Sequence, residues 1–329
     1  MSRRTTRVAP AAGALAIALA LSACSSSETP ASEKGGGSGK HRTIAFIPGC
    51  TCDPYYSTQI EGFKAAAKAA GATAIVQGPA NFQASEQIPV LQAVAQKKPD
   101  AIVIDPTDAT ALAAPIAVVV AKGIPVMTTG NNVNSDKIFT AIAASSTKGG
   151  TLGAQELMKQ KPEGGKVVFV HIKPGISSID DREKGYREAF AGQSNYKVLA
   201  NLYAGNDSAT QAAGLVQSAI TANPDLVAIF ASNVITAEGA ANAVKAAGKT
   251  GKIAVVGYDA SPQEAAYLKD GTLTALVSQN PYQIGQLAVE NTLKYLGGDH
   301  NIPKDQPLVP LVITKDNLDD PASQTALYK

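Results

Sequence analysis

One short stretch of the sequence, residues 50–56, gathers side chains that could bind a small polar molecule. It reads Cys-Thr-Cys-Asp-Pro-Tyr-Tyr, and so offers a carboxylate at Asp53 and adjacent phenol rings at Tyr55 and Tyr56. Carboxylates accept hydrogen bonds from hydroxyl groups, and aromatic rings cover the weakly polar C–H face of a sugar ring. A purely structural role is also open, because Asp is a good helix N-cap and Pro54 suits a first helical turn.

The flanking residues predict where this stretch lies. The apolar run 43–47 before it indicates a buried strand, and residues 59–68 after it have the pattern of an amphipathic helix. The stretch is therefore expected at the carboxyl end of a strand, where open α/β sheets place their ligands.

Other polar residues follow other predicted strands in the same way. They are Asn131 after 124–129, Arg182 beyond 166–171, Asn233 after 225–231, Asp259 after 252–257 and Gln279 after 273–278. Taken alone, each would more often be a turn residue, a helix cap or half of a surface ion pair. Their recurrence at one end of successive strands favours a shared site, and carboxylates, amides and a forked guanidinium suit a sugar or polyol.

The remaining pattern predicts two α/β lobes. The chain has 329 residues, of which 45% are apolar, and this is enough for a large core. Near-continuously apolar runs alternate with Ala-rich helical stretches in two series of similar size, which indicates parallel strands covered on both faces. A long helix, 282–296, and a final apolar run, 308–313, are expected to close the chain.

The first residues have the features of an export signal. Arg3, Arg4 and Arg7 precede an apolar stretch, 11–21, that is too short to span a bilayer. Residues 21–24, Leu-Ser-Ala-Cys, match the bacterial lipobox, in which the cysteine carries the lipid. We therefore expect a signal peptide at 1–23 and a diacylated Cys24 that anchors the exported protein to the outer face of the cytoplasmic membrane. A plain secretory signal is the alternative, and the export route is open.

The segment after the expected cleavage point, 24–41, is rich in Ser, Gly and Pro and is expected to be a flexible tether. The mature chain is close to neutral. Three of the 29 Lys and Arg residues belong to the signal, which leaves 26 basic against 27 acidic residues. Such a balance gives no footprint for nucleic acid.

Several motifs, in order, give the chain a family resemblance. They are Asp53-Pro54-Tyr55-Tyr56, Asp105-Pro106-Thr107-Asp108, Gly123-Ile124-Pro125-Val126, Arg182-Glu183-Lys184-Gly185-Tyr186, Ala231-Ser232-Asn233, Val255-Val256-Gly257-Tyr258-Asp259 and Gln279 with Gln283-Ile284-Gly285. With these motifs, residues 42 to about 314 resemble a periplasmic sugar-binding protein of the ribose/galactose type, the group related to LacI-family effector domains.

The resemblance implies the α/β fold of type I periplasmic binding proteins, two doubly wound parallel-sheet lobes joined by a three-stranded hinge. The N-terminal lobe would comprise 42–144 plus 279–306, and the C-terminal lobe 145–278 plus 307–320. The chain would cross between them near Ala144, near Gln279 and near Pro307. A monosaccharide, polyol or related small hydroxylated ligand would bind between the lobes of a monomer, without a metal or cofactor, for delivery to an ABC permease.

The resemblance also implies a set of ligand-binding residues: Asp53, Tyr55, Tyr56 and Asn131 from the first lobe, Arg182, Asn206, Asn233 and Asp259 from the second, and Gln279 from the connecting segment. The sequence departs from the ribose pattern at two places. Gly130-Asn131 stands where ribose binders carry an Asp-Arg pair, and the aromatic residue expected near Asn206 is absent. Both departures disfavour ribose itself.

Three questions stay open at this point. Cys50 and Cys52 could form a disulfide, ligate a metal or be two buried thiols, although none of the three histidines has ligand spacing to them. A receptor that presents its ligand to a chemoreceptor or kinase fits the same sequence. A lipid-anchored glycoside hydrolase would need paired carboxylates such as Asp53 and Asp259, and it lacks other support, since the chain has no Gly-x-Ser-x-Gly motif.

Overall fold

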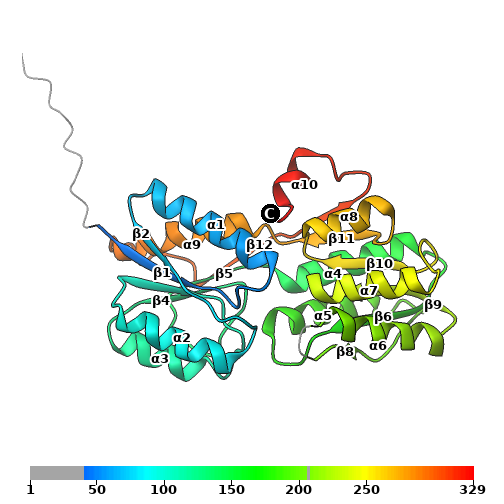
Figure 1. Ribbon diagram of the computed structural model, residues 1–329, viewed down its shortest axis with the longest axis horizontal. Coiled ribbons are helices and arrows are strands. Elements are labelled where there is room, and N and C mark those ends of the chain that lie inside the picture. The colour runs from blue at the N-terminus through cyan, green and yellow to red at the C-terminus, as the bar shows by residue number, and fades with distance from the viewer. Residues whose placement is uncertain (1–40, 206–207) are drawn as a thin grey trace, which may run out of the picture. The chain divides into compact units, whose positions relative to one another are not determined.

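The computed structural model describes residues 41–205 and 208–329, which form two α/β lobes (Figure 1). The expected signal peptide, Cys24, residues 24–40 of the expected tether and Asn206 lie outside the described residues. No helix within the described ranges is long and apolar enough to cross a membrane.

The first lobe is built on a six-stranded parallel sheet with strand order β12-β5-β4-β3-β1-β2. Its strands are β1 (Thr43–Ile47), β2 (Thr73–Val76), β3 (Ala101–Ile104), β4 (Val126–Thr129), β5 (Ala141–Ala144) and β12 (Asp305–Leu308). Its helices are α1 (Pro54–Ala69), α2 (Ala84–Gln96), α3 (Ala113–Ala121) and α9 (Pro281–Leu296). Helices α1 and α9 lie together on one face of the sheet, and α2 and α3 on the other (Figure 1).

The second lobe has a seven-stranded sheet of order β13-β11-β10-β9-β6-β7, with β8 also paired to β6. Its strands are β6 (Gly165–His171), β7 (Tyr196–Val198), β8 (Leu202–Tyr203), β9 (Leu226–Ala231), β10 (Ala254–Tyr258), β11 (Ala275–Ser278) and β13 (Leu311–Thr314). Its helices are α4 (Ser146–Gln160), α5 (Ser177–Phe190), α6 (Ala209–Ala222), α7 (Val234–Ala246), α8 (Pro262–Asp270) and α10 (Pro321–Ala326). Only β13 among these described strands runs antiparallel to its neighbour.

The apolar runs of the sequence form the cores of the two lobes. All four residues of β3 are completely buried, as are Val167, Phe169 and Val170 of β6. Strands covered by helices on both faces need apolar side chains at every position, and this explains why the runs show no alternation. The prediction of two parallel-sheet lobes with helices on both faces is therefore confirmed.

The lobes are connected at three places: between β5 and α4, between β11 and α9, and between β12 and β13. The apolar run expected at 308–313 is in fact two strands in different sheets, separated by Val309 and Pro310. Proline lacks the N–H that a sheet ladder needs, so the run breaks there. Pro307 itself belongs to the first sheet, and the third crossing follows Leu308. Helix α10 lies past the expected end of the second lobe. It was not predicted, because its short polar sequence has no apolar periodicity.

Candidate functional site

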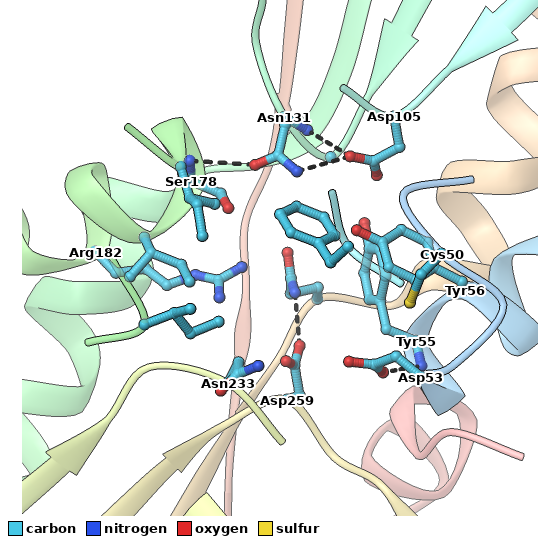
Figure 2. A pocket seen from close by; sticks show the side chains of 16 residues that line it. Cys50, Asp53, Tyr55, Tyr56, Asp105, Asn131, Ser178, Arg182, Asn233 and Asp259 are labelled. Atoms are coloured by element: carbon cyan, nitrogen blue, oxygen red, sulfur yellow. Dashed lines mark hydrogen bonds between the residues drawn. The ribbon is translucent and has the colours of Figure 1, made fainter. Parts of the chain in front are cut away.

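The carboxyl ends of strands from both sheets meet around a cavity (Figure 2). The space between the lining side chains measures about 510 Å³ including its open mouth, a size typical of small-molecule pockets. The predicted ligand-binding residues that lie within the described ranges all line it: Asp53, Tyr55, Tyr56, Asn131, Arg182, Asn233, Asp259 and Gln279. Six other lining residues had no predicted role: Phe82, Asp105, Ile172, Ile176, Ser178 and Ile179.

The position of Asp53 is compatible with both of the roles that the sequence left open. Its carboxylate Oδ1 accepts a 2.7 Å hydrogen bond from the backbone N–H of Tyr55, so it caps α1, and Pro54 begins the helix. The same side chain lines the cavity. Capping a helix N-terminus leaves a carboxylate further lone pairs, so Asp53 can cap α1 and still face a ligand.

Aromatic rings form one wall of the cavity. The rings of Tyr55 and Tyr56 meet edge to face at 5.0 Å, and the ring of Phe82 stacks on Tyr56 at 6.4 Å. Burial, and next the carboxylate of Asp105, raises the pKa of both phenols well above the ordinary value. Both tyrosines therefore remain neutral at physiological pH.

A disulfide joins Cys50 and Cys52, immediately before Asp53. It closes a small ring across Thr51, and Cys50 lines the cavity. The bond restricts the chain that leads into the N-cap of α1, and both sulfurs are used by it. No group of three or more His, Cys, Asp or Glu residues in the described parts of the chain is arranged to hold a metal ion.

Arg182 reaches the cavity from α5. Its Nη1 donates a 2.6 Å hydrogen bond to the carbonyl of Ser232, and its guanidinium carbon lies 3.7 Å from the centre of the Tyr258 ring. Only 4% of the residue is exposed. Arg182 is therefore not a surface ion-pair partner, which was the alternative that the sequence left open.

Two glycines allow α5 to approach α4 closely enough to place Arg182. A Cβ atom at Gly150 would collide with the backbone carbonyl of Arg182, and one at Gly185 would collide with that of Thr147. Because each helix presents a glycine to the backbone of the other, the two helices pack at a distance that no larger residue would permit.

Asn233, Asp259 and Gln279 also line the cavity, and Asn233 and Asp259 lie opposite Asn131 and Asp105 (Figure 2). Asn233 caps α7 in a reciprocal pair with Thr236. Oδ1 of Asp259 accepts hydrogen bonds of 2.6 Å from Nε2 of Gln279 and from the hydroxyl of Tyr328. The sequence gives no signal for Tyr328, since it is 69 residues away from Asp259 and stands in no motif.

Asn131 joins the two lobes at the edge of the cavity (Figure 2). Its Nδ2 donates to Oδ1 of Asp105 at 2.7 Å, and its own Oδ1 accepts from the backbone N–H of Ser178, in the second lobe, at 3.3 Å. The backbone N–H of Asn132 donates to Oγ of Ser177 beside it. Asp105 directly follows the buried run 101–104, so the strand-end rule could have found it.

The chemistry of the lining suits a neutral, hydroxylated guest. It combines carboxylates, amides and a single guanidinium with aromatic rings and three isoleucines. Burial raises the pKa of Asp105 to about 8, although hydrogen bonds from Asn131 lower it. Polar groups that are distributed over both lobes can hydrogen-bond one small molecule from opposite sides, while the rings and isoleucines contact its apolar surface.

Comparison with known proteins places this geometry in a family. Residues 44–300 match the family described as periplasmic binding protein domain. The chain is 30% identical to the ribose import binding protein of Salmonella typhimurium, over 87% of this chain and 92% of that one. It is 29% identical to the D-allose-binding periplasmic protein of Escherichia coli, over 71% of this chain and 78% of that protein.

Solved structures agree with the sequence relatives. An ABC transporter solute-binding protein from Agrobacterium vitis, bound with α-D-tagatopyranose, superimposes with a TM-score of 0.85 at 36% identity and covers 88% of this chain and 99% of its own. A carbohydrate transporter solute-binding protein from Agrobacterium radiobacter, in complex with D-arabinose, gives a TM-score of 0.83 at 28% identity and covers 88% and 100%. This chain therefore belongs to the periplasmic binding protein family, and to the ribose/galactose type that its motifs had indicated.

Proposed function

We propose that this protein captures a monosaccharide, polyol or related small hydroxylated molecule in the cavity between its lobes and delivers it to an ABC importer. The observation that carries the proposal is the cavity itself, to which both lobes contribute hydrogen-bonding side chains around a wall of aromatic rings. The related proteins whose structures contain tagatose and arabinose support it. The two departures from the ribose pattern, at Gly130-Asn131 and near Asn206, make ribose itself a poor candidate.

In this proposal each predicted residue has a definite role. Asp53, Asp259 and Asn233 accept hydrogen bonds from ligand hydroxyls, and Arg182 and Gln279 donate to ligand oxygens. Tyr55 and Tyr56, with Phe82 behind them, cover the C–H face of the ring. Asn131 contributes from the first lobe, and Asn206 remains a proposed contact from the second.

Ligand capture and delivery depend on the hinge. A molecule that hydrogen-bonds to both lobes favours the arrangement in which they meet, by the difference in its affinity for the two arrangements. The contacts of Asn131 with Ser178 and of Asn132 with Ser177 stabilise this same arrangement. The ligand-bound form is then what the permease recognises.

The proposal extends to the location of the protein. Residues 21–24 match the lipobox, and we propose that export exposes a diacylated Cys24, which anchors a monomeric protein to the outer face of the cytoplasmic membrane. Mass spectrometry of the mature N-terminus tests this, and an unmodified or differently placed N-terminus would contradict it. We expect binding without turnover, with no metal or cofactor, and a panel of nitrophenyl glycosides should remain intact.

A ligand screen followed by three substitutions tests the proposed function. Thermal shifts with D-ribose, D-allose, D-tagatose, D-arabinose, D-fucose and alditols should identify a ligand, because binding to the folded state raises the melting temperature. Calorimetry should then show that Tyr55→Ala, Tyr56→Ala and Arg182→Ala each weaken binding by at least about tenfold, roughly 1.4 kcal/mol.

Matched controls are available outside the cavity. Arg187→Ala alters the same helix as Arg182, and Tyr203→Ala removes a half-exposed ring; both should bind with unchanged affinity. The absence of any thermal shift across the panel, or equal affinities for all three cavity variants and the wild type, would contradict the proposal.

A further inference from the structure

Within the described parts of the chain, the carboxyl group of Asp105 has hydrogen-bond partners on one oxygen only. The residue follows β3 and is completely buried. Oδ1 accepts from Nδ2 of Asn131 at 2.7 Å and from its backbone N–H at 3.2 Å. Oδ2 is buried as well and has no hydrogen-bond partner among residues 41–205 and 208–329. A buried polar atom without a partner is costly, so its retention calls for an explanation.

The neighbouring strand end leaves room for this carboxyl group. Gly130 follows β4 with φ of 62°, in the left-handed region, and a Cβ atom there would collide with Oδ2 of Asp105. Any side chain at position 130 would therefore displace the carboxyl group. The combination of Gly130 and Asp105 means that β3, and not β4, supplies the acidic group at this part of the cavity wall.

Asp105 lies across the cavity from the other acidic residues of the site. Figure 2 shows Asp105 and Asn131 on one side of the cavity, and Asp53, Asn233 and Asp259 on the opposite side. A ligand that spans the cavity thus meets carboxyl groups on both sides. Oδ1 of Asp105 is already held in place by Asn131, and this fixes the direction of Oδ2 before a ligand arrives.

We propose that Asp105 is a specificity-determining ligand residue, whose Oδ2 accepts a hydrogen bond from one ring hydroxyl of the bound sugar and so selects the epimer that places a hydroxyl there. This inference rests on the proposed function. It assigns a contact to a residue outside the predicted set, and it explains why position 130 is a glycine.

The proposal has a consequence for protons. Burial gives Asp105 a pKa of about 8 in the ligand-free protein, so at neutral pH the group is mostly protonated. A ligand hydroxyl that donates to Oδ2 favours the ionised form, because a carboxylate accepts a hydrogen bond more strongly than a neutral carboxyl group does. Binding near neutral pH should then release a proton, and affinity should rise with pH until about 8. The charged or titratable groups that act on it are Arg182 on α5 and Tyr55 and Tyr56 on α1, and all three have raised pKa values.

The experiment compares Asp105→Asn with Asp108→Asn, which changes a partly exposed acid in the same loop. The probe is the sugar of the panel above that gives the largest thermal shift, measured by calorimetry between about pH 6 and pH 9 in two buffers of different ionisation enthalpy. We expect Asp105→Asn to weaken binding at least about tenfold at pH 8 and to abolish both the pH dependence and the proton release. Asp108→Asn should retain both.

Monodeoxy forms of the same sugar locate the hydroxyl. One of them should bind the wild type more weakly than the parent sugar does, but bind Asp105→Asn as well as the parent does, because the variant has already lost that contact. If a sugar binds and Asp105→Asn keeps the affinity and pH slope of the wild type, the inference is wrong while the proposed function stands.

If no sugar binds, the proposed function is contradicted instead. The role of Asp105 is then tested by the unfolding temperature of the ligand-free protein. A group retained for a ligand is not needed by the fold, so Asp105→Asn should unfold at the same temperature as the wild type or higher at pH 8. A lower unfolding temperature would show that the carboxyl group has a structural role and would overturn the inference.

Discussion

At the scale of single residues, the buried carboxyl of Asp105 links stability to pH. Its pKa is about 8 in the folded protein and about 3.9 in an unfolded chain. Between these values the folded protein holds a proton that the unfolded chain has lost. The contribution of this group to stability is therefore fully present below about pH 4 and is lost as the pH rises through about 8.

This predicts how Asp105→Asn compares with the wild type in the absence of ligand. The wild type should lose stability as the pH is raised from about 5 to about 8.5, and the variant lacks the titrating group that causes this loss. The free energy of unfolding of the variant should therefore increase relative to that of the wild type over this range. Urea unfolding at the two pH values measures the change, with Asp108→Asn as control. Parallel pH profiles for the wild type and Asp105→Asn would contradict the prediction.

Single residues also show how far sequence reasoning reaches. Asp53, Asn131, Asn233 and Asp259 were predictable because each follows an apolar run at the edge where parallel strands end. Tyr328 was not, since its contact with Asp259 depends on the path of the whole C-terminal segment. The helix-capping role of Asp53 and its place in the cavity are compatible, so the two readings of that residue were never exclusive.

At the scale of elements, the C-terminal segment ties the lobes together behind the site. Figure 1 shows α10 and the C-terminus at the junction of the lobes. The Tyr328 hydroxyl donates to Asp259, its backbone N–H donates to Ala260, and the backbone N–H of Lys329 donates to Oγ1 of Thr58 in the first lobe. The centre of the Tyr328 ring also lies 6.0 Å from that of the Tyr55 ring.

We therefore expect Tyr328→Phe to weaken both folding and ligand binding. The substitution removes a buried hydrogen bond to a carboxylate, a loss of about 1.5–3 kcal/mol in stability. Asp259 keeps its hydrogen bond from Gln279 but loses one of the contacts that position it in the site. Urea unfolding and calorimetry measure the two effects. Tyr203→Phe, at a half-exposed position, is the control, and a Tyr328→Phe variant with unchanged stability would show that this contact is not maintained in solution.

A second prediction concerns the contact between α4 and α5. Gly150→Ala should push α5 outward and displace Arg182, with a cost of about 1–3 kcal/mol in stability from overpacking and a further loss of ligand affinity. Gly214→Ala in α6 is the matched control, because a Cβ atom there meets nothing and the helix should gain about 0.5–1 kcal/mol. Equal melting temperatures for the two variants would contradict the close approach of α4 and α5.

Most elements were predictable from the sequence because their apolar patterns are strong. The long helix expected at 282–296 is α9, which begins at Pro281. The failure came at 308–313, where continuous apolar character concealed a change from one sheet to the other at Val309 and Pro310. Hydrophobicity records that a strand is buried, but it does not record which sheet the strand joins.

At the scale of the whole molecule, the proposed ligand capture depends on two lobes that bind one small molecule between them. The described chain crosses between the sheets three times, and each crossing is short. Short connections permit rotation of one lobe against the other while the lobes keep their internal packing. In the proposed mechanism, ligand binding and lobe movement are therefore a single event, and both lobes contribute residues that contact the ligand.

The most direct test is a crystal structure of the protein with the sugar that gives the largest thermal shift. The account predicts the sugar in the cavity, against the rings of Tyr55 and Tyr56, with hydrogen bonds both to Asp105 in the first lobe and to Arg182 or Asp259 in the second. A sugar bound outside this cavity, or held by the residues of one lobe alone, would contradict it.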